Sequence, residues 1–130
     1  MPTPNTNSPP GDVTIPLVHT TYEYYKLFHQ FIKLFPKSEK YSLGERIEKT
    51  ILDALELALR AAYATRGERV PLLKELDAKV QLLKTLTRLA HEIRAMDDKK
   101  YLALQEKLQE IGKMVGGWLR SMRNNTSAPT

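Results

Sequence analysis

Apolar residues recur at spacings of three and four over four long stretches of this chain, residues 18–35, 42–67, 70–95 and 97–122. This period matches the α-helix and gives each stretch one buried face. No stretch shows the alternation of apolar and polar residues, bounded by turn residues, that is typical of a β-strand. Four amphipathic helices joined by short turns predict an all-α, single-domain fold, the up-down-up-down four-helix bundle.

Local signals predict where the helices begin and end. Pro36 stops the first helix, and the segment Ser42-Leu43-Gly44-Glu45 fits a capping box at the start of the second. Arg66-Gly67 matches a basic last turn followed by a C′ glycine, so we expect the second helix to end there. Pro71 stands in the first turn of the third helix, where proline is tolerated.

The two ends of the chain differ in composition from the helical stretches. Residues 1–17 are rich in Pro, Ser and Thr, and residues 123–130 in Asn, Ser and Thr. Segments of this kind cannot bury enough apolar surface to order themselves. We therefore expect disordered tails at 1–17 and 123–130, on either side of a bundle at 18–122.

Three glycines interrupt the last predicted helix, and the only tryptophan follows them. They are Gly112, Gly116 and Gly117, directly before Trp118. Each glycine in a helix interior costs about 1 kcal/mol relative to alanine, so a close approach by another group is the usual compensation. Two interpretations stand side by side: tight helix packing inside one bundle, and a contact between subunits.

The third predicted helix carries more apolar surface than one neighbour needs. One line of apolar residues comprises Leu73, Leu76, Val80, Leu83 and Ala90, and a second comprises Leu82, Leu86, Leu89 and Ile93. The width fits a helix that touches two others in the bundle, and it also fits an additional contact outside it.

Catalytic and metal-binding motifs are absent from the sequence. The chain has no cysteine, and His19, His29 and His91 lack the spacing of metal ligands. There is no phosphate-binding loop and no dinucleotide fingerprint. We therefore expect no enzymatic activity, no metal and no cofactor.

Nothing in the sequence indicates a membrane protein. No apolar run reaches the ~20 residues that span a bilayer. The first residues lack the basic start and apolar centre of a signal peptide. We expect a cytoplasmic protein with no membrane partner.

Basic residues suggest a polyanionic partner, since the net charge is +5 and the pI is about 9.5. On the third helix Lys84, Arg88 and His91 fall within about 60° of one another. Two cations four residues apart repel mildly, but they suit phosphate oxygens. The candidate nucleic-acid-binding residues are Lys84, Arg88 and His91, with Arg46 and Lys49 on the second helix and Lys113 on the fourth. An ordinary solvated basic face is the alternative.

Four segments together resemble a known family. They are Tyr-Glu-Tyr-Tyr-Lys at 22–26, Phe35-Pro36-Lys37, Tyr-Ser-Leu-Gly-Glu-Arg-Ile-Glu at 41–48, and Ile-Gly-Lys-Met-Val-Gly-Gly-Trp-Leu at 111–119. The sequence resembles the accessory variability determinant of diversity-generating retroelements from about residue 21 to 121. Proteins encoded in intervening sequences of 23S ribosomal RNA share the expected fold and are the nearest alternative.

The resemblance implies a small basic four-helix bundle that forms a homopentameric ring. It implies a retroelement reverse transcriptase as partner, with binding of template RNA and of DNA or cDNA, in support of mutagenic reverse transcription. It implies no catalytic site, and it places the family's basic positions at Lys84, Arg88 and Lys113. Two other function classes stay open: a structural or ribosome-associated oligomer, and a helical module linked to a toxin or nucleotidyltransferase.

Overall fold

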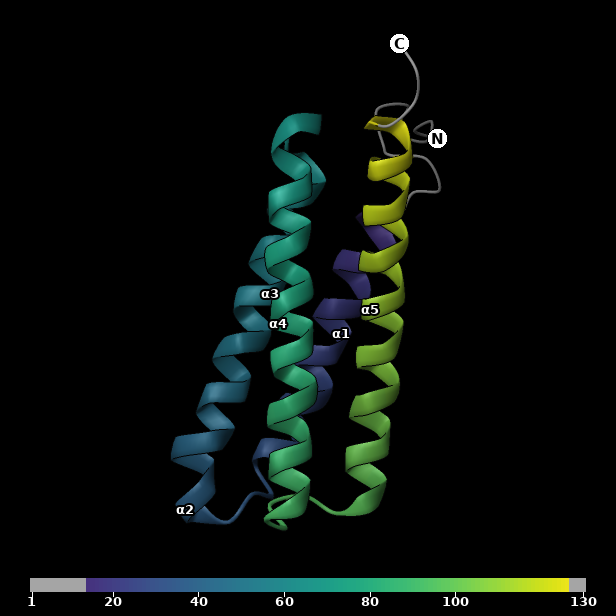
Figure 1. Cartoon of the computed structure of the whole chain (residues 1–130). Coiled ribbons are helices and arrows are strands. Elements are labelled where there is room, and N and C mark those ends of the chain that lie inside the picture. Colours follow the sequence, from purple (N-terminus) through teal and green to yellow (C-terminus); the bar gives the residue numbers. More distant parts are fainter. Residues whose placement is uncertain (1–13, 127–130) are drawn as a thin grey trace, which may run out of the picture.

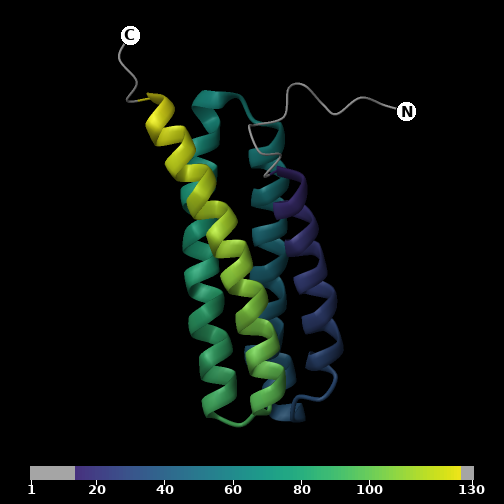
Figure 2. The same ribbon diagram turned by 90° about the vertical axis from the view of Figure 1, so that its right-hand side faces the viewer.

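The computed structural model describes residues 14–126, which form four long helices and no strand. The helices are α1 (Thr14–Ile32), α3 (Glu45–Tyr63), α4 (Arg66–Glu92) and α5 (Asp98–Thr126). A single turn of helix, α2 (Lys37–Glu39), and a π-helical turn, η2 (Lys40–Gly44), lead into α3. Successive long helices run in opposite directions, and α5 closes the bundle against α1 (Figures 1 and 2). The four-helix bundle predicted from the sequence is confirmed.

One apolar core runs along the bundle, and every long helix contributes to it at spacings of three and four. Its fully buried members include Tyr24 and Phe28 of α1, Ile47, Ile51 and Ala58 of α3, Leu73, Leu76 and Val80 of α4, and Leu104, Leu108 and Val115 of α5. Most of the predicted buried faces are therefore the observed ones. The spacing of apolar residues in the second predicted helix also places Leu43, Leu55 and Ala62 on its buried face, but these three are only partly buried.

Helix α1 begins at Thr14, four residues before the predicted boundary. Leu17 is fully buried and extends the stripe of Tyr24 and Phe28 by two helical turns, which accounts for the earlier start. At the other end α5 runs to Thr126, so the first residues of the predicted C-terminal tail are helical. The rest of the two predicted tails, residues 1–13 and 127–130, lies outside the described residues.

The predicted capping box at Ser42 is wrong. Ser42 lies inside the π-helical turn, and its hydroxyl donates to the backbone oxygen of Ser38 at 3.1 Å. The next glycine, Gly44, is where two segments approach closely. A Cβ there would lie 3.0 Å from the Ile32 side chain and 3.3 Å from the Glu39 carbonyl oxygen. The chain therefore enters α3 through a turn that is already helical, and no side-chain cap is formed.

The predicted helix end at Arg66-Gly67 is also wrong, because α3 ends at Tyr63 and α4 begins at Arg66. Thr65 and Glu68 form the capping box of α4, in which the Thr65 N–H donates to the Glu68 carboxylate at 3.3 Å. Gly67 falls in the first turn of α4, and a Cβ there would have no neighbour within 4 Å.

Arg69 of α4 connects the end of α3 to α5. Its guanidinium donates to the backbone oxygens of Ala61 at 2.9 Å and Ala64 at 2.8 Å, which satisfies carbonyls at the C-terminus of α3. The same guanidinium lies 5.2 Å from the ring centroid of Trp118, which is only 2% exposed. Burial lowers the pKa of Arg69 from its ordinary value, yet an arginine stays protonated. Arg69 therefore holds three helices together.

Arg69→Ala should lower the free energy of unfolding by about 2–3 kcal/mol. Two charge-assisted hydrogen bonds and a cation–π contact are lost, and two carbonyls lose their partner. Urea denaturation followed by circular dichroism measures the change. Arg66→Ala is the matched control, since Arg66 is exposed and should alter stability by less than about 0.5 kcal/mol. Equal midpoints for the two variants would contradict this role.

Helix α4 ends in a Schellman motif whose left-handed position is occupied by arginine. Arg94 has a φ of 66°. Its N–H donates to the His91 oxygen at 3.0 Å, and the Ala95 N–H donates to the Ala90 oxygen at 2.8 Å. Glycine is the usual residue at this position, because a Cβ is disfavoured there.

Arg94→Gly should therefore raise the free energy of unfolding by about 0.5–1 kcal/mol. The left-handed conformation costs a side-chain-bearing residue about 1–2 kcal/mol, and the greater entropy of unfolded glycine offsets part of the gain. Arg94→Ala removes the same charge without relieving the backbone and should bring no such gain. Thermal unfolding of both variants separates the two effects, and an equal rise for both would contradict the backbone explanation.

Candidate nucleic-acid interface

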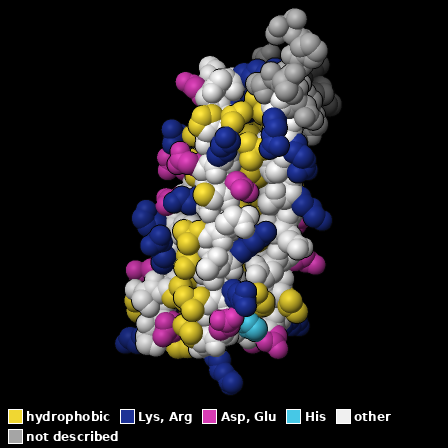
Figure 3. Space-filling view, viewed as in Figure 1, with side chains coloured by type: hydrophobic (Ala, Val, Ile, Leu, Met, Phe, Trp, Pro, Cys, Tyr) yellow, Lys and Arg dark blue, Asp and Glu magenta, His cyan; other side chains and the backbone are white. Residues whose placement is uncertain are grey.

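Lysine and arginine side chains gather over α4 and α5 along much of the bundle (Figure 3). The α4–α5 face is defined here by Lys84 and Arg88 of α4 together with Gly112, Lys113, Gly116 and Arg120 of α5. At 100° per residue the four α5 positions fall on one side of their helix. This face contains three of the candidate binding residues and two of the three glycines.

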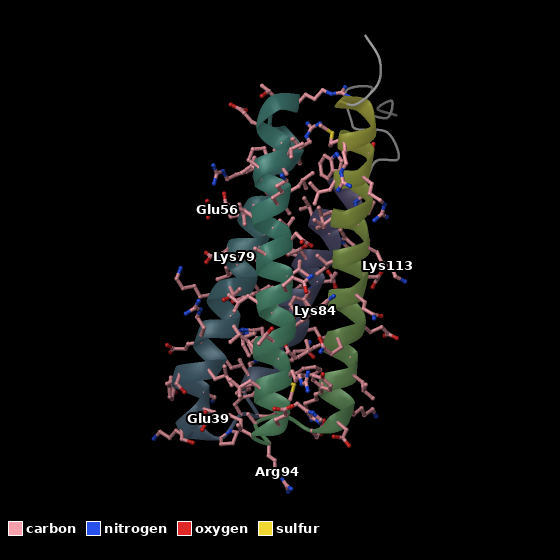
Figure 4. The ribbon with its side chains drawn as sticks, viewed as in Figure 1. Glu39, Glu56, Lys79, Lys84, Arg94 and Lys113 are labelled. Carbon is pink, nitrogen blue, oxygen red and sulfur yellow. The ribbon has the colours of Figure 1, made fainter. Side chains whose placement is uncertain are left out.

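Lys84 reaches from α4 across to α5. Its Nζ is 3.8 Å from the position that a Cβ of Gly112 would occupy, beside a Val80 methyl group at 3.7 Å. Figure 4 shows Lys84 on the α5 side of α4, with Lys79 on the α3 side. Lys84 is partly buried and forms no ion pair with any residue of the described range. The ammonium group of Lys84 is therefore available to an anion that binds at the α4–α5 face.

Arg120 lies over the other two glycines. Its guanidinium nitrogens are 3.5 Å from the Cβ position of Gly116 and 3.9 Å from that of Gly117. No ion pair joins Arg120 to a residue in the part of the chain that the structure describes. Each of the three glycines thus lies under the end of a basic side chain. Arg120 was not among the candidates from the sequence, although its spacing of four from Gly116 and three from Gly117 places them on one helix face.

Within one chain the glycines make no close helix contact. The distances from their Cβ positions are ordinary van der Waals distances, and the groups they meet are side chains only. Tight packing inside one bundle therefore does not account for these three glycines. Trp118 differs from them, because its ring is buried in the core beneath Arg69.

Lys113 is exposed on the outer side of α5, away from α4 (Figure 4). Among the described residues it has no ion-pair partner. Lys113 therefore forms the part of the α4–α5 face that lies farthest from α4.

Arg88 and His91 are engaged within the chain, which the sequence analysis did not anticipate. The Arg88 Nε donates to a Glu92 carboxylate oxygen at 3.0 Å. His91 Nε2 is 2.6 Å from an Asp98 carboxylate oxygen, and the imidazole stacks on Tyr101 at 4.3 Å between centroids. The contacts of His91 with Asp98 and Tyr101 thus stabilise the turn between α4 and α5. The predicted cluster shares a helix face, but only Lys84 of the three lacks an acidic partner.

Arg46 and Lys49 form a separate basic area on α3, which packs against α1 and α4. Lys49 Nζ is 3.6 Å from one Asp53 oxygen, and Lys79 of α4 is 3.9 Å from the other. Arg46 is exposed. The structure therefore does not bring these two candidates together with Lys84 and Lys113.

Neither a metal-ligand cluster nor a spanning helix is found over residues 14–126. No three His, Cys, Asp or Glu residues in that range are placed to hold a metal ion. No helix in the described range is long and apolar enough to cross a membrane.

A family model described as bAvd-like matches residues 17–122, from the buried Leu17 of α1 to the buried Met122 of α5. No curated protein sequence matches the chain.

Proposed function

We propose, from the premise that this chain belongs to the bAvd-like family, that it is a non-enzymatic accessory protein of a diversity-generating retroelement. In this role it binds the retroelement reverse transcriptase and its template RNA or cDNA, and it supports mutagenic reverse transcription. The observation that carries the proposal is the α4–α5 face, where Lys84 and Arg120 lie over the glycines of α5 without an acidic partner.

The chemistry of this face suits phosphates rather than bases. Lysine and arginine groups on rigid helices can bind phosphate oxygens, and arginine can do so with two parallel hydrogen bonds. The residues that define the face include no aromatic side chain on which a base could stack. Binding should therefore be directed to the backbone, similar for RNA and DNA, and strongly dependent on salt.

Assembly into a homopentameric ring is part of the proposal. The end of the second apolar line of α4 is open in a single chain, since Leu89 is 44% and Ile93 is 45% exposed, while Leu82 and Leu86 are partly buried. Figure 3 shows a strip of hydrophobic side chains beside α4. A ring needs two different faces that fit each other. The apolar line of α4 and the glycines of α5, which are covered mainly by the ends of the flexible Lys84 and Arg120 side chains, are surfaces that a second copy could bury.

A ring of basic bundles would act as a scaffold. It holds a template near the polymerase and raises the local template concentration to about the millimolar range. The phosphoryl transfer itself belongs to the polymerase. The accessory protein should then affect initiation and processivity rather than the chemical step.

Reconstituted cDNA synthesis tests whether the protein acts on initiation and processivity rather than on phosphoryl transfer. Adding the purified protein to the reverse transcriptase encoded beside it should start or lengthen cDNA on the cognate template. Addition of a single nucleotide to a preformed primer–template should stay nearly unchanged. The variant with Lys84→Ala and Arg120→Ala should lose the effect on long products. Extension or cleavage of nucleic acid by the isolated protein would contradict a non-enzymatic role.

A further inference from the structure

A second surface lies at the end of the bundle where α1 leads into α2 and α4 leads into α5. An open cavity of about 910 Å³ is present there. The start of α1 and the end of α5 lie toward the opposite end (Figure 1). The apolar residues lining the cavity are Phe31, Leu34, Pro36, Ala95 and Met96. Leu34 is 66% exposed at its rim, and Met96 is buried in its floor.

Most charges that line this cavity are already paired. Lys100 Nζ is 2.9 Å from the Asp97 carboxylate. The backbone N–H of Lys100 also donates to that carboxylate, which is the main reason that the pKa of Asp97 lies below its usual value. Asp98 is engaged by His91, and Glu92 by Arg88. Arg94 and Lys99 remain, and neither forms an ion pair among residues 14–126. The charge left for a partner is therefore positive.

Arg94 lowers the stability of the fold at its position. Its backbone is left-handed, and glycine would be more stable there. Figure 4 shows its side chain projecting beyond the end of the bundle. A residue that stability alone disfavours, next to a cavity lined in part by apolar residues, points to a contact made outside this chain.

We propose that this cavity docks an acidic, apolar segment of a protein partner. An apolar side chain of the partner enters over Leu34 and Met96, and flanking carboxylates meet Arg94 and Lys99. Apolar contacts inside a charged rim are the usual anatomy of such interfaces, and charge complementarity selects the partner. Apart from His91, Phe31 is the only residue with an aromatic ring among those that line the cavity. The Lys100 Nζ lies over this ring, 6.0 Å from its centroid. The site is therefore a poor platform for stacked bases, and a peptide fits it better.

Methyl NMR of the full-length chain tests the proposal with defined probes. The acidic probe is the peptide Asp-Asp-Leu-Leu-Asp-Asp, its matched control is Lys-Lys-Leu-Leu-Lys-Lys, and oligothymidylate represents phosphates. At millimolar concentrations the acidic peptide should shift the methyl signals of Leu34 and Met96, and the basic peptide should leave them unchanged. Oligothymidylate should instead shift signals next to the α4–α5 face, such as that of the buried Val80 methyl group beside Gly112. The two surfaces, and hence this proposal and the proposed nucleic-acid binding, are thereby tested separately.

Variants at Arg94 separate a docking role from a structural one. Arg94→Gly should weaken binding of the acidic peptide up to about fivefold, the value of one exposed charge contact, while it raises the melting temperature. Arg94→Lys keeps the charge and should retain most of the binding. Four results would each overturn the proposal. The first two are unshifted Leu34 and Met96 methyl signals with the acidic peptide, and equal shifts with the acidic and the basic peptide. The other two are shifts of these methyl signals with oligothymidylate, and an unchanged affinity of the Arg94→Gly variant for the acidic peptide.

Discussion

Replacing both Lys84 and Arg120 by alanine should weaken binding to RNA and to single-stranded DNA by similar factors, up to about thirtyfold per chain at low salt. The estimate takes about 1 kcal/mol for each exposed charge contact, and a tenfold change in affinity for each 1.4 kcal/mol. The slope of log affinity against log salt should fall by about 0.7 for each lost phosphate contact on a single strand. Fluorescence anisotropy over a series of salt concentrations measures both quantities. In a ring the contacts of several copies add together, so the loss for the assembly is larger.

Two control variants make this result specific to the α4–α5 face. Lys33→Ala with Lys37→Ala removes the same charge from exposed positions at the end of α1 and in α2, and should have a much smaller effect. Arg88→Ala should cost less than Lys84→Ala, because Arg88 is already paired with Glu92. Equal losses for the Lys33/Lys37 and the Lys84/Arg120 pairs would mean that net charge, rather than this face, governs binding.

Leu89→Asp combined with Ile93→Asp should dissociate the assembly into folded single chains. Both side chains are almost half exposed in one bundle, so carboxylates there cost the isolated chain little. In an interface the same carboxylates would be buried without partners, which is strongly unfavourable. Light scattering coupled to gel filtration should give a multiple of 14.9 kDa for the natural protein and 14.9 kDa for the variant. Circular dichroism should show unchanged helix content.

Gly116→Leu tests whether the side of α5 that carries Gly112 and Gly116 belongs to that interface. Within one chain the new Cβ would meet only the guanidinium of Arg120 at 3.5 Å, the end of a flexible side chain. Leucine is the better helix former by about 0.8 kcal/mol, so the single chain should remain folded. Loss of the assembly would then come from overfilling a contact between copies. Leu102→Asp, at a 64% exposed position of α5, is the control. A natural protein that is monomeric at micromolar concentration would contradict the ring.

The architecture of the chain could be predicted from the sequence because it depends on periodicity. The spacing of Leu104, Leu108, Ile111 and Val115 gives a helix and its buried face without knowledge of its neighbours. Helix ends depend on context. Ser42–Glu45 and Thr65–Glu68 have the same capping-box pattern, yet only the second caps a helix. At Ser42 the preceding residues are already helical, and the short-range pattern does not contain that information.

The candidate site was predictable in part for similar reasons. Lys84 has no acidic residue three or four positions away in the sequence, and in the described residues neither Lys84 nor Lys113 forms an ion pair. The pairing of Arg88 with Glu92 is an i, i+4 contact that the sequence already contains. The contact of His91 with Asp98 depends on the turn that brings α5 back beside α4, so it required the three-dimensional structure.

The proposed role, in which this protein joins a reverse transcriptase to nucleic acid, can be tested by co-purification. The tagged protein is isolated from cells that also express the neighbouring reverse transcriptase and template RNA, with and without ribonuclease treatment. We expect the natural protein to retain both partners, and the Lys84→Ala, Arg120→Ala variant to retain much less template RNA. Recovery of neither the polymerase nor the RNA with the natural protein would contradict it, and would favour a structural or ribosome-associated oligomer.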